Sequence, residues 1–224
     1  MAGRDDTIWL RPERAGVGRP AERSRAQVTT AALALADRHG LDAVSMRRVA
    51  AELGTGPGSL YRYVATRDEL LDLMVDATAA EYRLGPATGE TIDDLVAVAE
   101  QARAIMRRHP WLPGLLTARP VLGPHGALVL EYVLGVLADQ PADTRTKLEL
   151  FGVLMGLTAQ FTQHELSADP AGAQRQATYL THLAGTGDFP QLAAVLAAES
   201  GDRQPSADPF RSVLPRVLAG LLGT

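Results

Sequence analysis

Cysteine is absent from this sequence of 224 residues, and aromatic side chains make up only 5% of it. The lack of cysteine excludes disulfides, thiolate zinc sites and cysteine nucleophiles. No apolar run reaches the roughly 18 residues that a membrane-spanning helix needs, so we expect no membrane partner. Residues 1–22 carry charges of both signs and no continuous apolar segment, unlike a secretory signal peptide. These absences predict a cytoplasmic protein.

The familiar motifs of enzymes are missing as well. The sequence has no His-Glu-x-x-His, no Gly-x-Ser-x-Gly, no phosphate-binding loop and no dinucleotide-binding glycine pattern. Its five histidines are scattered, and the neighbours His164 and Glu165 point to different faces of any helix. We therefore predict no catalytic residue, no metal and no cofactor. A helical enzyme, or a small-molecule-binding protein without DNA activity, stays the alternative.

Charge is divided unevenly along the chain, whose formal net charge is −4. Residues 1–67 hold 11 arginines and 7 acidic residues, which gives +4, whereas residues 68–224 hold 11 basic and 19 acidic residues, which gives −8. The N-terminal part should therefore attract polyanions. Solubility alone also requires charged residues, so the charge by itself leaves nucleic-acid binding open.

Apolar residues make up 46% of the sequence, and they recur at helical spacing with no strand pattern. The predicted fold class is all-α. The first helix should occupy residues 24–39 and end at Gly40, and a capping box at Thr66 and Glu69 should open the fourth. In the C-terminal part we expect a turn at 110–123. The helices expected there lie near 93–109, 124–139, 143–166, 174–183, 191–198 and 210–222. Pro215 should kink or restart the last one.

The segment from Ser45 to Val64 has the pattern of two short helices joined by a turn that contains two glycines. Ser45 is the expected N-cap of the first helix, and Pro57 suits the first turn of the second. Leu60 and Val64 lie four residues apart and should face the core. That assignment predicts four outward residues: Gly58, Ser59, Arg62 and Tyr63.

Such a helix could enter a major groove of DNA. Arg62 can reach a guanine edge or a phosphate, Tyr61 and Tyr63 can contact phosphates or a thymine methyl, and Ser59 is a short donor. Further backbone contacts are expected from the helix starts at Ser45 and Thr66 and from three arginines: Arg47, Arg48 and Arg67. Helix-turn-helix patterns also occur in proteins that never touch DNA, so the pattern alone leaves the function open.

Residues 25–76 contain four notable segments in this order: Gly40-Leu41, Ser45-Met46-Arg47-Arg48-Val49-Ala50, Leu60-Tyr61-Arg62-Tyr63-Val64 and Arg67-Asp68-Glu69-Leu70-Leu71. In these segments the chain resembles the N-terminal domain of the tetracycline-repressor (TetR) family. The resemblance implies an all-helical homodimer that represses transcription from an inverted-repeat operator in double-stranded DNA and is released by a small-molecule effector. Positions that the family uses on DNA match Arg47, Pro57, Gly58, Ser59, Tyr61, Arg62, Tyr63 and Arg67.

The C-terminal half resembles the subgroup closest to the tetracycline repressors, through Arg108-His109-Pro110-Trp111-Leu112 and Ala118-Arg119-Pro120-Val121-Leu122-Gly123-Pro124. No histidine precedes Arg119 to ligate a drug-bound magnesium, so we do not predict recognition of a metal–tetracycline chelate. The predicted domains are a flexible N-terminal arm at 1–22, a three-helix helix-turn-helix domain at 23–68, and a helical ligand-binding and dimerisation domain at 69–224.

The expected helix at 143–166 is apolar almost all round, which predicts burial on every side. Pairing of this helix and the last one with their symmetry mates would form a four-helix dimer interface, although a central helix of a monomer would look similar. A largely apolar effector should bind between the helices. Candidate lining residues, each of which could equally be plain core, are Met106, Trp111, Tyr132, Phe151, Met155, Gln160 and His164, with Gln160 and His164 as the polar candidates.

The arm at 1–22 carries its own hypothesis. Arg11, Arg14 and Arg19 precede the helix-turn-helix and could lie along the duplex or in its minor groove. A disordered tail is the alternative reading of the same composition.

Overall fold

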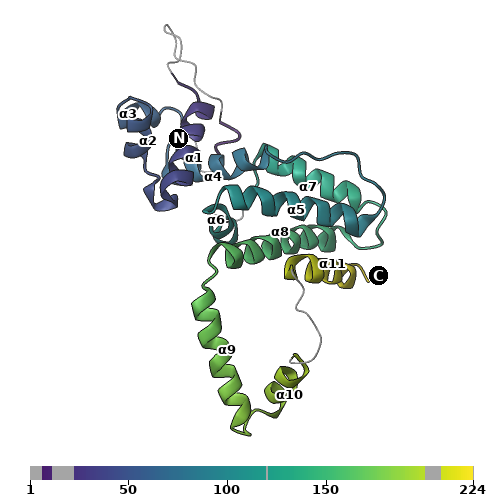
Figure 1. Cartoon of the computed structure of the whole chain (residues 1–224). Helices are drawn as coiled ribbons and strands as arrows, with labels where there is room; N and C mark the ends of the chain where they lie inside the picture. The colour runs from purple at the N-terminus through teal and green to yellow at the C-terminus, as the bar shows by residue number, and fades with distance from the viewer. Residues whose placement is uncertain (1–6, 12–22, 120, 200–207, 224) are drawn as a thin grey trace.

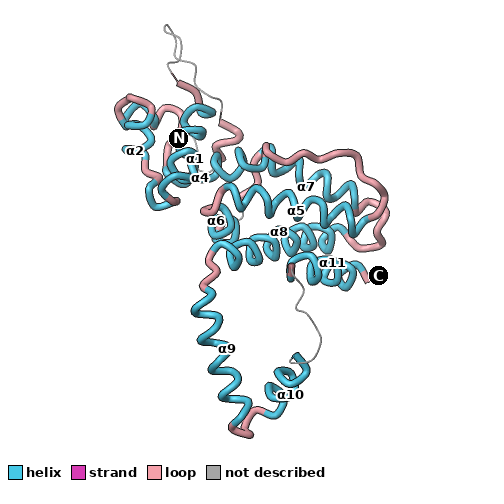
Figure 2. The backbone as a smooth tube through the Cα atoms, viewed as in Figure 1, coloured by secondary structure: helices cyan, strands magenta, loops and turns pink. Residues whose placement is uncertain are grey.

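A computed structural model describes residues 7–11, 23–119, 121–199 and 208–223 of the chain. In these ranges the chain forms helices joined by loops and has no strand (Figure 2), which confirms the predicted all-α fold. In chain order the helices are α1 (Arg25–His39), the 3-10 turn η1 (Leu41–Ala43), α2 (Met46–Glu52), α3 (Pro57–Leu60), α4 (Arg67–Ala79), α5 (Thr91–Arg108), α6 (Leu112–Ala118), α7 (Pro124–Val136), α8 (Thr144–Leu166), α9 (Pro170–Gly185), α10 (Pro190–Glu199) and α11 (Pro209–Leu222).

Side-chain caps fix the starts of the N-terminal helices. Ser24, Ser45 and Thr66 each accept a hydrogen bond from the backbone N–H three residues later, as expected for N-caps. Glu69 departs from the predicted capping box, because its carboxylate accepts from the N–H of Ala65 rather than from that of Thr66. Gly40 follows α1 with φ of +78°, a conformation that glycine adopts without strain.

The structure differs from the expectations at two proline-containing segments. Residues 112–118, where a turn was expected, form α6, because Pro113 lies in the first helical turn, where its missing N–H costs no hydrogen bond. Of the two outcomes expected at Pro215, a kink or a restart, the restart does not occur, since α11 runs through this residue from Pro209 to Leu222. Helix α9 is also longer than the predicted stretch at 174–183.

Two clusters of buried side chains hold the fold together. The first joins α1 to α4 and continues into α5 and α6 through residues such as Met106 and Leu112. The second lies between α5, α7, α8 and α11 and includes Leu95, Leu154 and Phe210. Helices α1 to α3 therefore gather at one end of the molecule, and α4 leads from them into the larger helical body (Figure 1).

Part of the predicted flexible arm belongs to the first cluster. Ile8 is only 2% exposed, and Trp9 packs against the same cluster. The prediction of an unstructured arm was therefore wrong for residues 7–11, because Ile8 and Trp9 bury apolar surface there. Residues 1–6 and 12–22 lie outside the described part.

Helices α9 and α10 form a hairpin that projects away from the helical body (Figure 1). No residue of α9 is buried, and α9 packs mainly on α10. Helix α8, which leads into the hairpin, packs on α5, α6 and α11 but leaves Val153 36% exposed. The expectation that α8 is buried on every side therefore does not hold within one chain.

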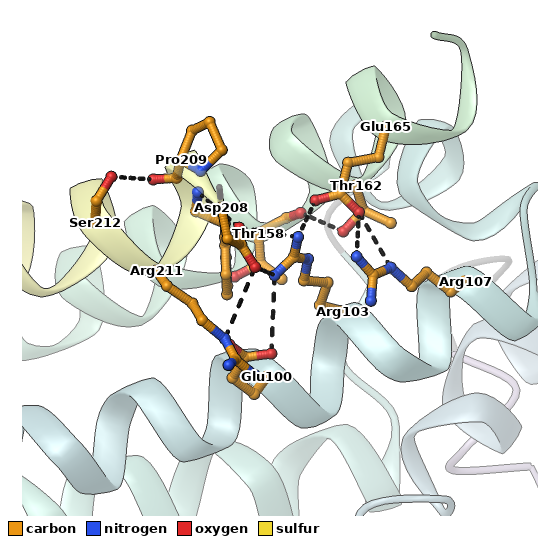
Figure 3. A network of polar contacts seen from close by, with 11 residues as sticks. Glu100, Arg103, Arg107, Thr158, Thr162, Glu165, Asp208, Pro209, Arg211 and Ser212 are labelled. Carbon is orange, nitrogen blue, oxygen red and sulfur yellow. Dashed lines mark hydrogen bonds and ion pairs between the residues drawn. The ribbon is translucent and has the colours of Figure 1, made fainter. Parts of the chain in front are cut away.

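Arg103 of α5 holds both ends of the hairpin segment (Figure 3). Its guanidinium donates to Glu165 at the end of α8 and, at 2.7 Å, to Asp208, the N-cap of α11. Arg107 donates to the other oxygen of Glu165 at 2.8 Å. The guanidinium carbon of Arg103 also lies 4.6 Å from the centroid of the Phe210 ring. One buried cation thus ties α5, α8 and α11 together.

This cluster shifts the titration of its carboxylates. Burial by itself would raise the pKa of Glu165, but hydrogen bonds from Arg103 and Arg107 outweigh it and hold that pKa below its usual value. The hydrogen bond from Arg103 is the main reason why the pKa of Asp208 is also lowered. In the unfolded chain these carboxylates are ionised above about pH 4.5, so above this pH their lowered pKa values contribute fully to the stability of the fold. The contribution disappears as the pH falls through their pKa values in the folded state.

Arg103→Met is expected to lower the free energy of unfolding by about 2 kcal/mol at neutral pH, because Glu165 and Asp208 lose their shared cation. The difference from wild type should shrink as the pH falls from about 5 to 3, where the wild-type carboxylates also protonate. Urea denaturation at each pH measures both effects. Arg103→Lys, which keeps the charge but not the planar fork, should lie between the two. A difference that stays constant down to the lowest pH would contradict the role of these ion pairs.

Candidate DNA interface and effector cavity

The predicted helix-turn-helix is formed by α2 and α3. Met46, Val49 and Ala50 of α2 and Leu60 of α3 are buried in the first cluster beside α1. The turn between the two helices contains Gly54, whose φ of +63° suits a residue without a Cβ. This confirms the arrangement expected from the sequence, with α3 as the helix that faces outward.

Most of the predicted DNA-contacting side chains are exposed. Pro57, Gly58 and Arg62 are exposed, and Tyr61 is 54% exposed. On α2 the side chains of Arg47 and Arg48 are exposed as well. Three arginines and one tyrosine of the helix-turn-helix therefore lie in solvent, and α3 begins beside them with the glycines Gly56 and Gly58.

Tyr63 does not project outward, so that prediction was wrong. Its side chain is only 8% exposed and belongs to the first cluster. The physical reason is helical phase, because a residue three positions after the buried Leu60 lies on nearly the same face as one four positions after it.

Three other predicted residues make contacts within the protein. Ser59 is half-buried, and its hydroxyl donates to the carbonyl of Gly56 at 2.7 Å. Ser45 accepts from the N–H of Arg48 as an N-cap. Arg67 donates to the carbonyls of Val44 and Leu41, at 2.9 and 3.3 Å, and so braces the turn before α2.

Arginines of the N-terminal arm were also DNA candidates. Arg11 pairs with Glu69 of α4 at 2.5 Å, so its guanidinium is already engaged inside the protein. Arg14 and Arg19 lie outside the described residues.

A cavity of about 580 Å³ lies between α4, α5, α6, α7 and α8. Three of the predicted lining residues, Met106, Phe151 and Met155, do line it. Its volume falls in the range of small-molecule sites in proteins. The predicted location between the helices of the C-terminal domain is therefore matched by an actual hollow.

Four of the nominated residues do not line this cavity. Trp111 is buried elsewhere, and its ring N–H donates to Asp37 of α1 at 2.7 Å. Tyr132 packs against the second cluster. Gln160 and His164 are exposed, because the cavity ends on α8 at Ala159 and these side chains lie beyond it or point away. The preference for Gln160 and His164 as polar ligand contacts was wrong for the single chain.

The cavity depends on residues that the sequence reading missed. Its wall includes small residues on α5, α7 and α8, where larger side chains would fill the space: Ala102, Gly126, Gly152, Gly156 and Ala159. The α6–α7 loop adds Val121, Leu122 and Gly123. Glycines in otherwise apolar helices were a usable signal, since a core helix gains nothing from them unless space is needed.

Polar groups of the wall are already bonded within the protein. Asp76 accepts from the backbone N–H groups of His125 and Gly126, at 2.9 and 3.0 Å. Arg119 pairs with Asp68 and Asp72. The hydroxyl of Tyr82 donates to the sulfur of Met155, and burial raises the pKa of this hydroxyl, so it stays neutral.

Among the described residues, no helix is both long and apolar enough to cross a membrane.

Comparison with known proteins gives two family matches. Residues 28–74 match the bacterial regulatory proteins of the tetR family, and residues 85–224 match the tetracyclin repressor-like C-terminal domain.

Individual relatives agree with these matches. The chain is 35% identical to the HTH-type transcriptional repressor DrrR1 of Streptomyces coeruleorubidus, over 87% of this chain and 76% of DrrR1. It is 30% identical to an HTH-type transcriptional regulator of Saccharopolyspora erythraea, over 99% and 94% of the two chains. The crystal structure of apo ActR from Streptomyces coelicolor superposes with a TM-score of 0.79 at 29% identity, over 90% of this chain and 95% of ActR.

These matches cover both halves of the chain and agree with the fold and with the exposed helix α3. The alternative of an enzyme or of a binding protein without DNA activity is not favoured. The chain belongs to the TetR family, and it is a ligand-responsive, DNA-binding transcriptional regulator with a tetracycline-repressor-like C-terminal domain.

Proposed function

We propose that this regulator is a repressor whose effector is a largely apolar molecule that binds in the cavity between α4 and α8. The observation that carries the proposal is the wall itself. It is mainly apolar, and Asp76, Arg119 and Tyr82 already have partners within the protein. A strongly polar effector would lose its hydration there without gaining equivalent hydrogen bonds. ActR, which is related in sequence, has been crystallised with (S)-DNPA and with actinorhodin.

On the DNA side, the proposed contacts come from α2 and α3. Arg62 and Tyr61 would reach base edges and phosphates, and Arg47 and Arg48 would lie over the backbone. Gly58 and Ser59 lie at the start of α3, where a close approach to DNA needs small side chains. Arg67 and Ser45 make hydrogen bonds within the protein next to α2, so their part in DNA binding would be to hold α2 and α3 in place.

Dimerisation is proposed to use α8 and α11, paired with their symmetry mates. Val153 of α8 and Leu221 of α11 are 36% and 44% exposed in the single chain, and Leu157, Phe161 and Val217 are half-buried. Apolar surface of this kind is the usual core of a permanent interface. The dimer would hold two copies of α3 about 34–36 Å apart, one turn of DNA.

Binding of a labelled duplex, taken from the DNA upstream of this gene, tests the proposal. Fluorescence anisotropy should show tight binding that weakens with salt, by roughly 0.9 in the log–log slope for each neutralised phosphate. Actinorhodin, the ligand of one ActR crystal structure, and a series of apolar aromatic compounds are then compared with sugars and amino acids for their ability to release the protein from DNA. Release by strongly polar compounds alone would contradict an apolar effector.

Arg62→Ala is expected to weaken operator binding by about 1–3 kcal/mol, or to relax base preference at one position in each half-site. The effect should appear without loss of thermal stability, because Arg62 is exposed. Anisotropy titrations with the operator and with single-base variants measure both. Tyr63→Phe is the matched control, since the buried ring keeps its packing. A larger change of base preference in Tyr63→Phe than in Arg62→Ala would reverse the assignment.

Gly58→Ala separates folding from DNA contact. A Cβ on Gly58 would meet no atom within 4 Å, so the variant should fold, and the helix should gain up to about 1 kcal/mol over glycine. Operator affinity should nevertheless fall, because the added methyl occupies space that the groove needs. Thermal melts and anisotropy are compared. Unchanged affinity would show that α3 does not approach DNA at this point.

Met155→Trp is expected to fill part of the cavity. The compound that releases wild type from DNA should be needed at a concentration about tenfold higher, equal to about 1.4 kcal/mol of binding. Operator affinity should stay the same. Glu149→Trp, an exposed position on the same helix and outside the wall, is the control and should respond like wild type. Equal responses of both variants would place the effector elsewhere.

A further inference from the structure

Residues 7–11 form a short turn that contacts both halves of the molecule. The N–H of Leu10 donates to the carbonyl of Thr7 at 3.0 Å and closes the turn. Ile8 is buried in the first cluster, and Arg11 pairs with Glu69 in the first turn of α4. We call residues 7–11 the strap.

One side of the strap touches the rim of the effector cavity. Trp9 lies so close to Gly123 that a Cβ built on this glycine would be 2.7 Å from Cζ2 of the indole. The same Cβ would be 2.5 Å from Oδ1 of Asp76. Both Gly123 and Asp76 line the cavity. Trp9 therefore packs directly on the outside of the cavity wall, with no free space between.

On its other side, the strap is connected to the segment that contains α3 by the side chain of Arg25. Arg25, the first residue of α1, donates from Nη1 to the carbonyl of Arg11 at 2.7 Å and to that of Ile8 at 3.3 Å. Its Nε donates to the carbonyl of Tyr63 at 3.1 Å. Tyr63 follows the last residue of α3 by three positions, and its ring is buried in the first cluster. A single guanidinium thus joins the strap to the end of the α3 segment.

We propose that the strap couples the cavity to α3, with Trp9 and Arg25 as its positioning residues. This rests on the proposed function, because it assumes an effector in the cavity and DNA at α3. An effector that displaces Gly123 must also displace Trp9, because close-packed atoms transmit such shifts. The strap carbonyls then carry the shift to Arg25 and to Tyr63. This path runs beside α4, which also spans the two halves.

The test uses the full-length protein and the labelled upstream duplex, without any effector. Gly123→Ala forces Trp9 and Asp76 to move, and it should lower operator affinity by about fivefold or more, the low end of ordinary allosteric coupling. In the background of Trp9→Ala the indole is absent, so the same glycine substitution should change affinity by less than about twofold. An equal loss in both backgrounds, or no loss in either, would overturn the proposal.

Gly126→Ala is the matched control. The atoms nearest to its added Cβ would belong to Leu122, at 3.2 Å, and to Asp76, at 3.8 Å, and none of the three nearest belongs to Trp9. It should therefore leave operator affinity within about twofold of wild type if coupling passes through Trp9. A loss equal to that of Gly123→Ala would assign the effect to a general disturbance of the cavity wall and would overturn the proposal.

Hydrogen exchange of the wild-type protein provides a second measurement, which stands even if Gly123→Ala does not fold. Because coupling is reciprocal, DNA binding should slow amide exchange in residues 7–11 and 121–126 as well as in α1 to α3. Protection confined to α1 to α3 would overturn the proposal. A wild-type protein that binds no upstream duplex at all would instead count against the proposed function, so the two failures are distinguishable.

Discussion

The carboxylate of Asp76, buried near the end of α4, is the contact on which the relation between the two halves depends. Its oxygens face the backbone N–H groups of His125 and Gly126 and the ring nitrogen of His125, the last at 2.8 Å. A negative group at the first turn of a helix satisfies N–H groups that have no partner within the helix. Because α4 also carries the DNA-reading unit, the start of α7 and the wall of the cavity are fixed to the helix that leads to DNA.

A second polar junction joins the halves just beyond the end of α4. The ring nitrogens of His109 lie 2.7 Å from Asp37 of α1 and 2.8 Å from Glu81 just after α4. Asp37 also accepts from Trp111, at the start of α6. Both junctions involve elements that border the cavity, and the second one joins these elements to Asp37 of α1.

Much of the fold could be predicted because its signals are local. Ser24, Ser45 and Thr66 determine where helices start, because each accepts a hydrogen bond from the backbone N–H three residues later. Such short-range contacts can be predicted from the sequence alone. Tyr63 was misplaced because α3 is only one turn long, so an error of one position in helical phase turns a side chain from solvent to core. Ile8 and Trp9 were missed because two apolar residues make no periodic pattern, although they are enough to dock a short segment.

The cavity was harder to predict than the fold, since it is defined by volume that side chains do not fill. Nominating large apolar residues and polar neighbours on one helix found Met106, Phe151 and Met155, but it also named Trp111, Gln160 and His164. Whether an apolar side chain lines a hollow or closes it depends on residues far away in sequence. Glycine and alanine positions on α7 and α8 carry that information only after the helices are known to face one another.

The Arg103 cluster has a consequence for how this protein can diverge from its relatives. Since Glu165 and Asp208 are both held by the same guanidinium, the chain leaves and rejoins the helical body at two neighbouring, fixed points. The hairpin of α9 and α10 between those points buries no residue of α9 in the body. Its length and composition can therefore change as those of a surface insertion do, at a small entropic cost and without disturbing the cavity or the reading unit.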